Sequence, residues 1–526
     1  HPPFKIIPTT LAIVTKIMKN LNPNKAILKA MTPDLAPLLT TLYNEAIDQN
    51  NYPDALKITK LLAVFKKDDR QLPEKYRPIS LLPIIGKILD KIINDQIMTH
   101  CTTHNIISAS QYAFRPNSST SLALQTILDK LRKHTSKRQP TLAIYLDLSK
   151  AYDTISHDKL LHKLRHIFNF DDNTITFLTS YFTNRTQATH TEHAQSEHQT
   201  ITHGIPQGST LSTTFFILYI NHIWTTATHA DIYTYADDTT LIITAPDSDT
   251  LQTYAQHDLT QLVSYLHTNN LVPNATKTTY TTFYPHDHPP TNLYFNGTAL
   301  EQESMTKLLG VWIQDSLKFH QNATNVIKKL QPHIHTLRYI NKLLPTTTMI
   351  RQYYSLISPQ LLYAITIWGN EKSSKQYLLP LHRTHKKIIR LLFNQPPRTP
   401  TKPFMQKHKL LYIYNIYFLR MCVEMHPFIH PEKQLSRPQH NHQYFFTADI
   451  HQYPTSSSTK NLLYIPNPHN YSKTHQPAHT MENSTKKHSE LWNRLTPELR
   501  LEQNLTRFKK QLKLHLLEMQ EKQIFP

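Results

Sequence analysis

The sequence predicts an α+β fold in which helices surround a small sheet that carries acidic residues. Residues 232–243 contain two β-prone runs that flank Asp237 and Asp238, and because Asp is depleted in strands, the pair predicts a tight hairpin turn. Residues 142–147 form an apolar run that ends in Asp147. Ser156 then has the character of a helix N-cap, and leucines follow it at helical spacing. A strand, an acidic strand end and a helix therefore follow one another.

The acidic residues of these two stretches suggest a metal site. Two adjacent carboxylates repel each other unless a cation lies between them, and a divalent metal ion is the simplest such cation. An ordinary Asp-Asp turn is the alternative for Asp237 and Asp238 taken alone. If the strand before Asp147 lies beside the hairpin, Asp147 and Asp237 can share two metal ions roughly 3.5–4 Å apart.

Composition narrows the class of protein. A chain of 526 residues is too long for one compact core. The formal net charge of +20 predicts a polyanionic partner, with nucleic acid ahead of a membrane surface, although a merely soluble basic protein is the alternative. Two cysteines exclude a disulfide framework and fit a reducing compartment. The sequence shows no apolar run of about 18 residues, so we expect no membrane span. The chain begins without Met and reads as a fragment of a longer product.

Glycine and histidine contents are unusual. The chain has only six glycines, whereas about 7% is usual, and it has 33 histidines. The abundant residue types have codons that begin with A or C, which indicates a coding strand poor in G. We therefore attribute the histidines to mutational drift and interpret none as a metal ligand. The glycines that persist are informative, in particular Gly204, Gly208 and Gly310.

Seven stretches, taken in order, resemble the motifs of the reverse transcriptases of non-LTR, LINE-type, jockey-like retrotransposons. They are Tyr-Arg-Pro-Ile-Ser-Leu-Leu at 76–82, Gln-Tyr-Ala-Phe-Arg at 111–115, the segment 147–153, Gly-Ile-Pro-Gln-Gly-Ser at 204–209, Tyr-Ala-Asp-Asp at 235–238, Asn-Ala-Thr-Lys at 274–277 and Leu-Leu-Gly-Val at 308–311. Weaker resemblance reaches Trp-Asn-Arg-Leu at 492–495. The ordered set covers most of the chain.

The resemblance implies a right-hand polymerase fold with fingers, a ferredoxin-like palm built on an antiparallel sheet, and a helical thumb. We expect a helical N-terminal extension at 1–56, fingers at 57–140, the palm at 141–312 and a helical thumb or connector at 313–430. The C-terminal region, 431–526, is expected to be partly loop-like and to end in an amphipathic helix.

The resemblance also implies an activity, RNA-directed DNA synthesis by two-metal transfer of nucleotides from dNTPs to a primer 3′-hydroxyl. The implied metal ligands and catalytic residues are Asp147, Asp237 and Asp238. They would hold two Mg²⁺ ions, for which Mn²⁺ could substitute. Because adjacent strand residues face opposite ways, Asp237 is expected to bind metal directly and Asp238 to support it.

Three implied nucleotide-binding residues are Arg77, Arg115 and Tyr152. An arginine suits a triphosphate because its planar fork binds two oxygens at once, although an ordinary salt bridge is the alternative for both arginines. In the resembling enzymes an aromatic residue at the position of Tyr152 packs beneath the sugar and excludes a 2′-hydroxyl. The alternative for Tyr152 is a core aromatic.

The remaining implied site residues lie in later motifs. Gln207 and Gly208 correspond to residues that contact the nucleotide or the templating base. Lys277 corresponds to a lysine near the leaving pyrophosphate, with a solvated surface lysine as the alternative. Leu309 and Gly310 correspond to the primer grip, a turn that holds the primer end.

The implied partners are an RNA template, a DNA primer or target and dNTPs, with no membrane. In target-primed synthesis an endonuclease cuts the target, so we expect an endonuclease domain upstream in the full product. We expect an intracellular ribonucleoprotein of cytoplasm and nucleus. One alternative is a degenerate copy that only binds RNA, which a short glycine-free loop at 22–26 favours. A group II intron maturase is the other alternative.

Overall fold

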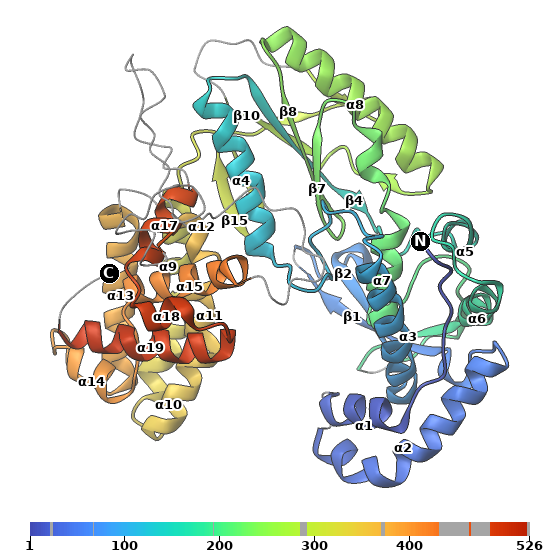
Figure 1. Cartoon of the computed structure of the whole chain (residues 1–526), viewed down its shortest axis with the longest axis horizontal. Coiled ribbons are helices and arrows are strands. Elements are labelled where there is room, and N and C mark those ends of the chain that lie inside the picture. The colour runs from blue at the N-terminus through green and yellow to red at the C-terminus, as the bar shows by residue number, and fades with distance from the viewer. Residues whose placement is uncertain are drawn as a thin grey trace, which may run out of the picture.

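The computed structural model describes residues 1–21, 25–66, 68–192, 194–283, 292–369, 374–430, 462–463 and 484–522. Most of the glycine-free loop at 22–26 lies outside the described residues, as does most of the loop-like region predicted within 431–480. Figure 1 shows a central sheet with one group of helices on each side, and the C-terminal helices form a lobe on the left.

The central sheet has five strands in the order β13-β10-β3-β8-β7, and all neighbours are antiparallel except β10 and β13. Its middle strand β3 is buried along its whole length, which its run of aliphatic and aromatic residues explains. The strand predicted to end in an acid does lie beside the predicted hairpin, here formed by β7 and β8. The bounds are β3 Thr141–Leu146, β7 Asp231–Tyr235, β8 Asp238–Thr244, β10 Thr279–Thr282 and β13 Glu301–Gln302.

Each face of this sheet carries its own hydrophobic core, because successive side chains of a strand point to opposite faces. Leu142 and Ile144 face a core that includes α7 (Thr210–Tyr219) and α8 (Ser248–Thr268). Ala143 and Tyr145 face a second core that includes α4 (Thr120–Ser136) and the C-terminal helices. The sheet is therefore packed between two helical layers, and both of its faces are buried.

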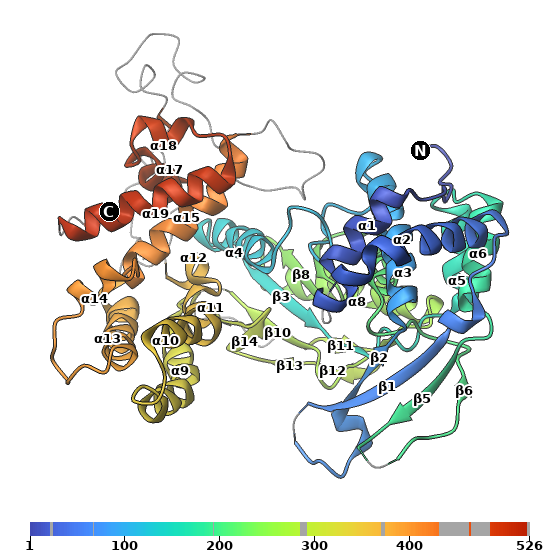
Figure 2. The same cartoon turned by 90° about the horizontal axis from the view of Figure 1, so that it is seen from below.

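A second sheet, in the order β2-β1-β5-β6, projects to one side of the first (Figure 2). The predicted strand at 57–65 is β1, and the hairpin predicted within 183–203 is β5 and β6. Helices at the N-terminus and after β2 pack in the same half of the molecule. The bounds are β1 Ile58–Phe65, β2 Tyr76–Leu81, β5 Thr186–His190, β6 Gln199–Thr200, α1 Leu11–Asn20, α2 Lys25–Asp48, α3 Ile84–Thr103, α5 His157–His166 and α6 Asp172–Phe182.

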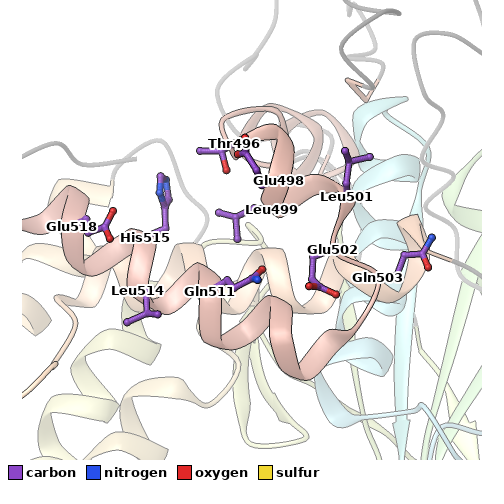
Figure 3. Close-up of a pocket in the computed structure, with 10 residues that line it drawn as sticks. All are labelled: Thr496, Glu498, Leu499, Leu501, Glu502, Gln503, Gln511, Leu514, His515 and Glu518. Atoms are coloured by element: carbon purple, nitrogen blue, oxygen red, sulfur yellow. The ribbon is translucent and has the colours of Figure 1, made fainter.

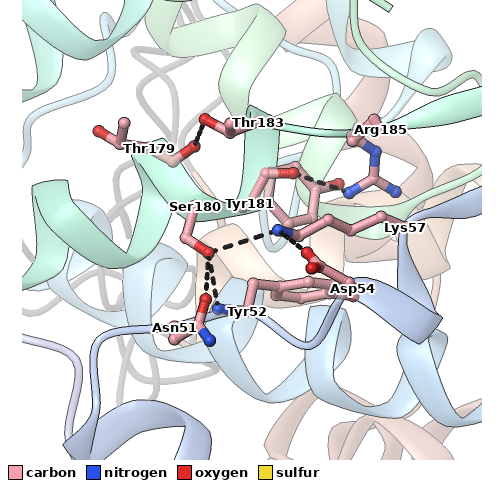
Figure 4. Close-up of polar contacts among 9 residues, drawn as sticks. All are labelled: Asn51, Tyr52, Asp54, Lys57, Thr179, Ser180, Tyr181, Thr183 and Arg185. Atoms are coloured by element: carbon pink, nitrogen blue, oxygen red, sulfur yellow. Dashed lines mark hydrogen bonds and ion pairs between the residues drawn. The ribbon is translucent and has the colours of Figure 1, made fainter. Parts of the chain in front are cut away.

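A buried cation fastens this second sheet to helix α6 (Figure 4). The Lys57 ammonium, whose side chain is 3% exposed, pairs with Asp54 at 2.6 Å and contacts the hydroxyl of Ser180 at 3.5 Å. Ser180 in turn donates to Asn51 and accepts from the backbone N–H of Tyr52. A buried charge is stable only when it is paired and hydrogen-bonded, and this network provides both.

The C-terminal lobe is almost entirely helical and follows the β14–β15 hairpin. The helix predicted near the end of the chain is confirmed as α19, which buries Phe508, Leu512 and Leu516. Among the described residues, no helix has the length and apolar character needed to cross a membrane. The bounds are β14 Met305–Leu308, β15 Val311–Gln314, α9 His320–Ile340, α10 Thr346–Gln352, α11 Ser358–Leu362, α12 Ile365–Trp368, α13 Ser374–Leu392, α14 Lys402–Lys407, α15 Ile413–Ile429, α17 Ser484–Asn493, α18 Pro497–Leu501 and α19 Leu505–Glu521.

Eight short elements of the described residues remain. They are the 3₁₀ helices Asp54–Leu56, Pro73–Lys75 and Ile223–Thr226, the π-helix Tyr353–Ile357, and the short strand pairs β4 Leu148–Ser149 with β9 Val272–Pro273 and β11 Tyr294–Phe295 with β12 Thr298–Ala299. The β4–β9 pair matters for the site, since it brings residues 272–277 beside the acidic end of β3.

Candidate active site

Three aspartates meet at one end of the central sheet. Leu146 of β3 pairs with Thr239 of β8, so Asp147, the next residue, lies beside Asp238. Tyr235 pairs with Asp238, which leaves Asp237 in the two-residue turn of the hairpin. Asp147 and Asp237 are partly buried and Asp238 is exposed. The tight turn and the neighbouring strand end are both confirmed.

A glutamine from the second motif holds this turn. Ala236 has φ 57°, a left-handed conformation that non-glycine residues seldom adopt, so the turn needs support. Gln111 provides it, because its Oε1 accepts from the backbone N–H of Ala236 at 3.1 Å and from that of Ala113 at 2.9 Å. The backbone N–H of Tyr112 also donates to the carbonyl of Thr234 at 2.8 Å. The sequence motif contained Gln111, but gave it no role.

The carboxylates repel one another. Burial and the charge of Asp147 raise the pKa of Asp237, and Arg77 and Lys66 offset part of the rise. Although Asp238 reaches solvent, the protein around it and the charges of Asp237 and Asp147 raise its pKa to about 6. Both shifts mean that the charged form of the site lacks a sufficient counter-charge.

Asp147 is held in place by hydrogen bonds to Asn274 and Thr278. Its Oδ2 accepts a 2.8 Å hydrogen bond from the side chain of Asn274, and its backbone N–H donates to the hydroxyl of Thr278. The Lys277 ammonium lies 3.9 Å from the same Oδ2, but its side chain is 66% exposed. The motif at 274–277 therefore orients Asp147 as well as presenting a lysine.

The glycines of the 204–209 loop are needed for close backbone packing. A Cβ on Gly208, which has φ 152°, would lie 2.4 Å from the carbonyl oxygen of Ser80, and the Ser80 N–H donates to the carbonyl of Gln207. Gly208 therefore lets the loop pack closely against strand β2, and its contact with a nucleotide or templating base stays a prediction. The side chain of Gln207 donates to Asp153 at 3.0 Å.

A buried carboxylate lies under this loop. Asp90 of α3 is 1% exposed and accepts hydrogen bonds from the hydroxyls of Ser209 and Tyr52. Burial raises the pKa of Asp90, while these hydrogen bonds and Arg185 lower it. Ser209 is also the N-cap of α7. Asp90 therefore ties the loop and the start of α7 to α3, a role that the sequence did not reveal.

The predicted nucleotide-binding residues lie in different settings. Tyr152 is half-buried, stacks on Phe216 with ring centroids 4.5 Å apart, and has a pKa raised by burial and by Asp237. Arg77 is exposed on β2, and no carboxylate of the described residues lies within ion-pair distance of it. Arg115 instead donates to the backbone carbonyls of Ser108 and Gln111. The structure thus gives Arg115 a loop-anchoring role, and nucleotide contact by these residues stays a prediction.

The Leu309–Gly310 segment is the turn of the β14–β15 hairpin, as expected for a primer grip. Leu309 has φ 44° and Gly310 has φ 81°. The turn therefore has a left-handed backbone at two successive residues, one of which is not glycine.

A different group of side chains has the close ligand spacing of a metal site. In the described part of the chain, only His229, His257 and Asp258 place ligand atoms all within 4.8 Å of one another, so the three aspartates above are more widely spaced. Asp258, however, accepts hydrogen bonds from three backbone N–H groups, at residues 228–230, and contacts His257 Nδ1 at 3.1 Å. Its acceptor positions are filled, which makes it a loop cap.

A groove of about 600 Å³ lies between α18 and α19, in the C-terminal lobe, and Figure 3 shows its lining. Leu501 and Leu514 border it together with Glu498, Glu502 and Glu518. None of the predicted site residues lines it, so this groove and the acidic site are separate features.

An antiparallel sheet with acids at a strand end and in the adjoining hairpin, flanked by a second sheet and a helical lobe, is the architecture of a right-hand nucleic-acid polymerase. Residues 64–313 match the family model described as reverse transcriptase (RNA-dependent DNA polymerase). This part of the chain, just under half of its length, therefore resembles a reverse transcriptase domain. Members of this family generally use divalent metal ions.

Proteins of similar sequence are named as RNA-directed DNA polymerases of mobile elements. The chain is 23% identical over 419 residues to the RNA-directed DNA polymerase from mobile element jockey of Drosophila melanogaster, a match covering 75% of this chain and 45% of the relative. It is 25% identical over 416 residues to the jockey polymerase of Drosophila funebris, and this match covers 74% of this chain and 44% of the relative. A probable RNA-directed DNA polymerase from transposon BS of Drosophila melanogaster is 25% identical over 360 residues. This match covers 65% of this chain and 39% of the relative. The chain spans less than half the length of these relatives.

Proposed function

We propose that this chain extends a primer 3′-hydroxyl with dNTPs on an RNA template. The observation that carries the proposal is the β3–β8 register, which brings Asp147 beside the hairpin that carries Asp237 and Asp238. The raised pKa values of Asp237 and Asp238 indicate a site whose charge is incomplete without a cation. The reverse transcriptase match over residues 64–313 supports the same reaction.

The donor set fits hard divalent cations, since it consists of carboxylate oxygens. We propose that Asp147, Asp237 and Asp238 hold two Mg²⁺ ions and that Mn²⁺ can replace them. When bound, such ions make the primer hydroxyl a better nucleophile and neutralise the triphosphate. Asn274 keeps the Asp147 carboxylate oriented for this role through its 2.8 Å hydrogen bond.

The other side chains serve the substrates. Arg77 offers an exposed guanidinium to the triphosphate, and the exposed Lys277 ammonium can neutralise the leaving pyrophosphate. On the same face of β1 and β2 as Arg77 lie the exposed apolar residues Leu62, Val64 and Ile79, which suit contact with bases. Tyr152 would pack beneath the sugar of the incoming nucleotide.

We also propose the setting of this reaction, namely its nucleic-acid partners, the source of the primer end and its place in the cell. A DNA primer or target and an RNA template would bind the basic chain, whose formal net charge is +20. An endonuclease elsewhere in a longer product would supply the nick for target-primed synthesis. The complex would work as a ribonucleoprotein in cytoplasm and nucleus.

The test is primer extension by the purified chain on an annealed RNA template with dNTPs and Mg²⁺. We expect synthesis by the wild type and by Asp231→Asn, a control that neutralises a half-exposed aspartate on the same hairpin. RNA binding without any synthesis would instead support the degenerate-copy alternative. The intron-maturase alternative gains no support from the relatives, which are named as mobile-element or transposon polymerases.

A further inference from the structure

A tyrosine of the C-terminal lobe contacts the turn of the β14–β15 hairpin. The Tyr363 hydroxyl donates a hydrogen bond to the carbonyl of Leu309, 54 residues earlier in the chain. A Cβ on Gly310 would lie 3.3 Å from the Tyr363 ring, so the ring packs directly against this glycine. Both residues of the turn therefore contact a single side chain from outside the hairpin.

Tyr363 is itself held in place. Its carbonyl accepts a 3.1 Å hydrogen bond from the indole of Trp368, which is 1% exposed. Its backbone N–H donates to the carbonyl of Pro359, and Ala364 has φ 50°, which sharply turns the chain between α11 and α12. The position of the ring is thus set by the buried part of the lobe.

The same region reaches the acidic hairpin. Leu309 and Tyr235 both pack against a small cluster formed by Tyr112, Leu122 and Ala123. Tyr235 lies two residues before Asp237, so one contiguous set of side chains links the lobe, the turn and the acids.

We propose that Tyr363 is a positioning residue that fixes the Leu309–Gly310 turn relative to the Tyr235–Asp238 hairpin, and thereby places a primer 3′ end beside the carboxylates. This inference rests on the proposed function. The Tyr363 side chain also couples the C-terminal lobe to the palm, so a shift of the lobe would move the turn. Tyr363 is 42% exposed, so part of the residue remains open to solvent.

The test compares Tyr363→Phe, which removes only the hydroxyl, with Tyr354→Phe, a matched control. Tyr354 is 45% exposed in the neighbouring π-helix. The probe is a DNA primer on an RNA template with 2-aminopurine at the primer 3′ end, whose fluorescence rises when the end unstacks. The measurement is made in an Asp237→Asn background, so that it depends on binding and not on synthesis.

We expect Tyr363→Phe to raise the terminal fluorescence about twofold, while the duplex Kd and the melting temperature stay near the control values. In the otherwise wild-type chain it should lower kcat about tenfold with little change in the KM for dNTP, corresponding to the loss of one hydrogen bond. Unchanged fluorescence in a duplex that binds normally would overturn the inference. A wild type that extends no primer would reject the proposed function instead, whatever the fluorescence shows.

Discussion

The side-chain amide of Asn274 donates a 2.8 Å hydrogen bond to Oδ2 of Asp147, 127 residues earlier in the chain. The backbone N–H of Asn274 also donates to the carbonyl of Asp147 at 3.0 Å. The β4–β9 pair brings the two residues together, because β4 directly follows Asp147 and β9 directly precedes Asn274. The Asp147 carboxylate, a proposed cation ligand, is thereby fixed in one orientation.

We predict that Asn274→Ala lowers kcat for primer extension roughly tenfold, since a hydrogen bond to a charged group contributes about 1.5 kcal/mol or more. Asn274→Asp should lower it further, because a second carboxylate beside Asp147 adds repulsion. Single-turnover extension at saturating dNTP measures the rate of both variants. Equal rates for wild type and Asn274→Ala would show that Asp147 needs no orienting partner.

The acidic end of the sheet should cost stability when no metal is bound. Asp238 has a folded-state pKa of about 6 against an ordinary value of 3.8. Between these values the native state binds more protons than the unfolded state, so its contribution to the free energy of unfolding falls as pH rises and then levels off above pH 6. Asp238→Asn removes this loss of stability, because asparagine has no carboxyl group to ionise.

We therefore predict that the melting temperature of metal-free wild type falls relative to that of Asp238→Asn as pH rises from 4 to 7. Added Mg²⁺ should narrow the gap, because it stabilises the charged form of the wild-type site. Thermal unfolding at several pH values, with and without Mg²⁺, measures the difference. A gap that does not vary with pH would mean that Asp238 has an ordinary pKa.

Two glycines allow a matched test of the 204–209 loop. Both Gly208 and Gly297 have positive φ, but only Gly208 has a backbone oxygen where its Cβ would lie, and Gly297 has open space there. Gly297→Ala should cost about 1 kcal/mol of backbone strain and leave activity unchanged. Gly208→Ala should cost more and should also abolish extension, since the loop must move away from Ser80. Equal effects of the two variants on stability and activity would contradict the packing argument.

Sugar selection tests the placement of Tyr152. Its ring stacks on Phe216 on one side and lies near Asp237, so it can both pack in the core and border the nucleotide. Tyr152→Val should admit ribonucleotides, whereas Tyr152→Phe should retain the preference for dNTPs. The measurement is the ratio of kcat/KM for a dNTP and the matching rNTP. An unchanged ratio for Tyr152→Val would assign the residue to the core alone.

The elements that strong local patterns define were predictable from sequence. The alternation at 232–243 around Asp237 and Asp238 gave the hairpin, and the apolar run before Asp147 gave its partner strand. Ser156 does cap its helix, with its side chain accepting from the backbone N–H of Lys159. These features depend on residues close together in the chain.

Other features depend on long-range contacts that no local pattern records. Asp90 reads as one more polar position of an amphipathic helix, yet it is buried beneath Ser209, 119 residues away. Arg115 is a local exception, because its guanidinium donates to the backbone carbonyls of the nearby residues 108 and 111. Its motif did not indicate this contact, and nucleotide binding by Arg115 stays a prediction. The contact of Tyr363 with the Leu309–Gly310 turn depends on how the lobe packs, which the sequence does not reveal.

The most direct test of the proposed reaction is single-turnover extension of an RNA-templated primer by Asp237→Asn, together with its RNA binding in the same buffer. We predict that this variant makes no product and binds RNA with the wild-type Kd, because the carboxylate holds cations and not the template. Asp147→Asn should behave in the same way, and Asp231→Asn should resemble the wild type. Synthesis by Asp237→Asn at the wild-type rate would contradict the assignment of the three aspartates.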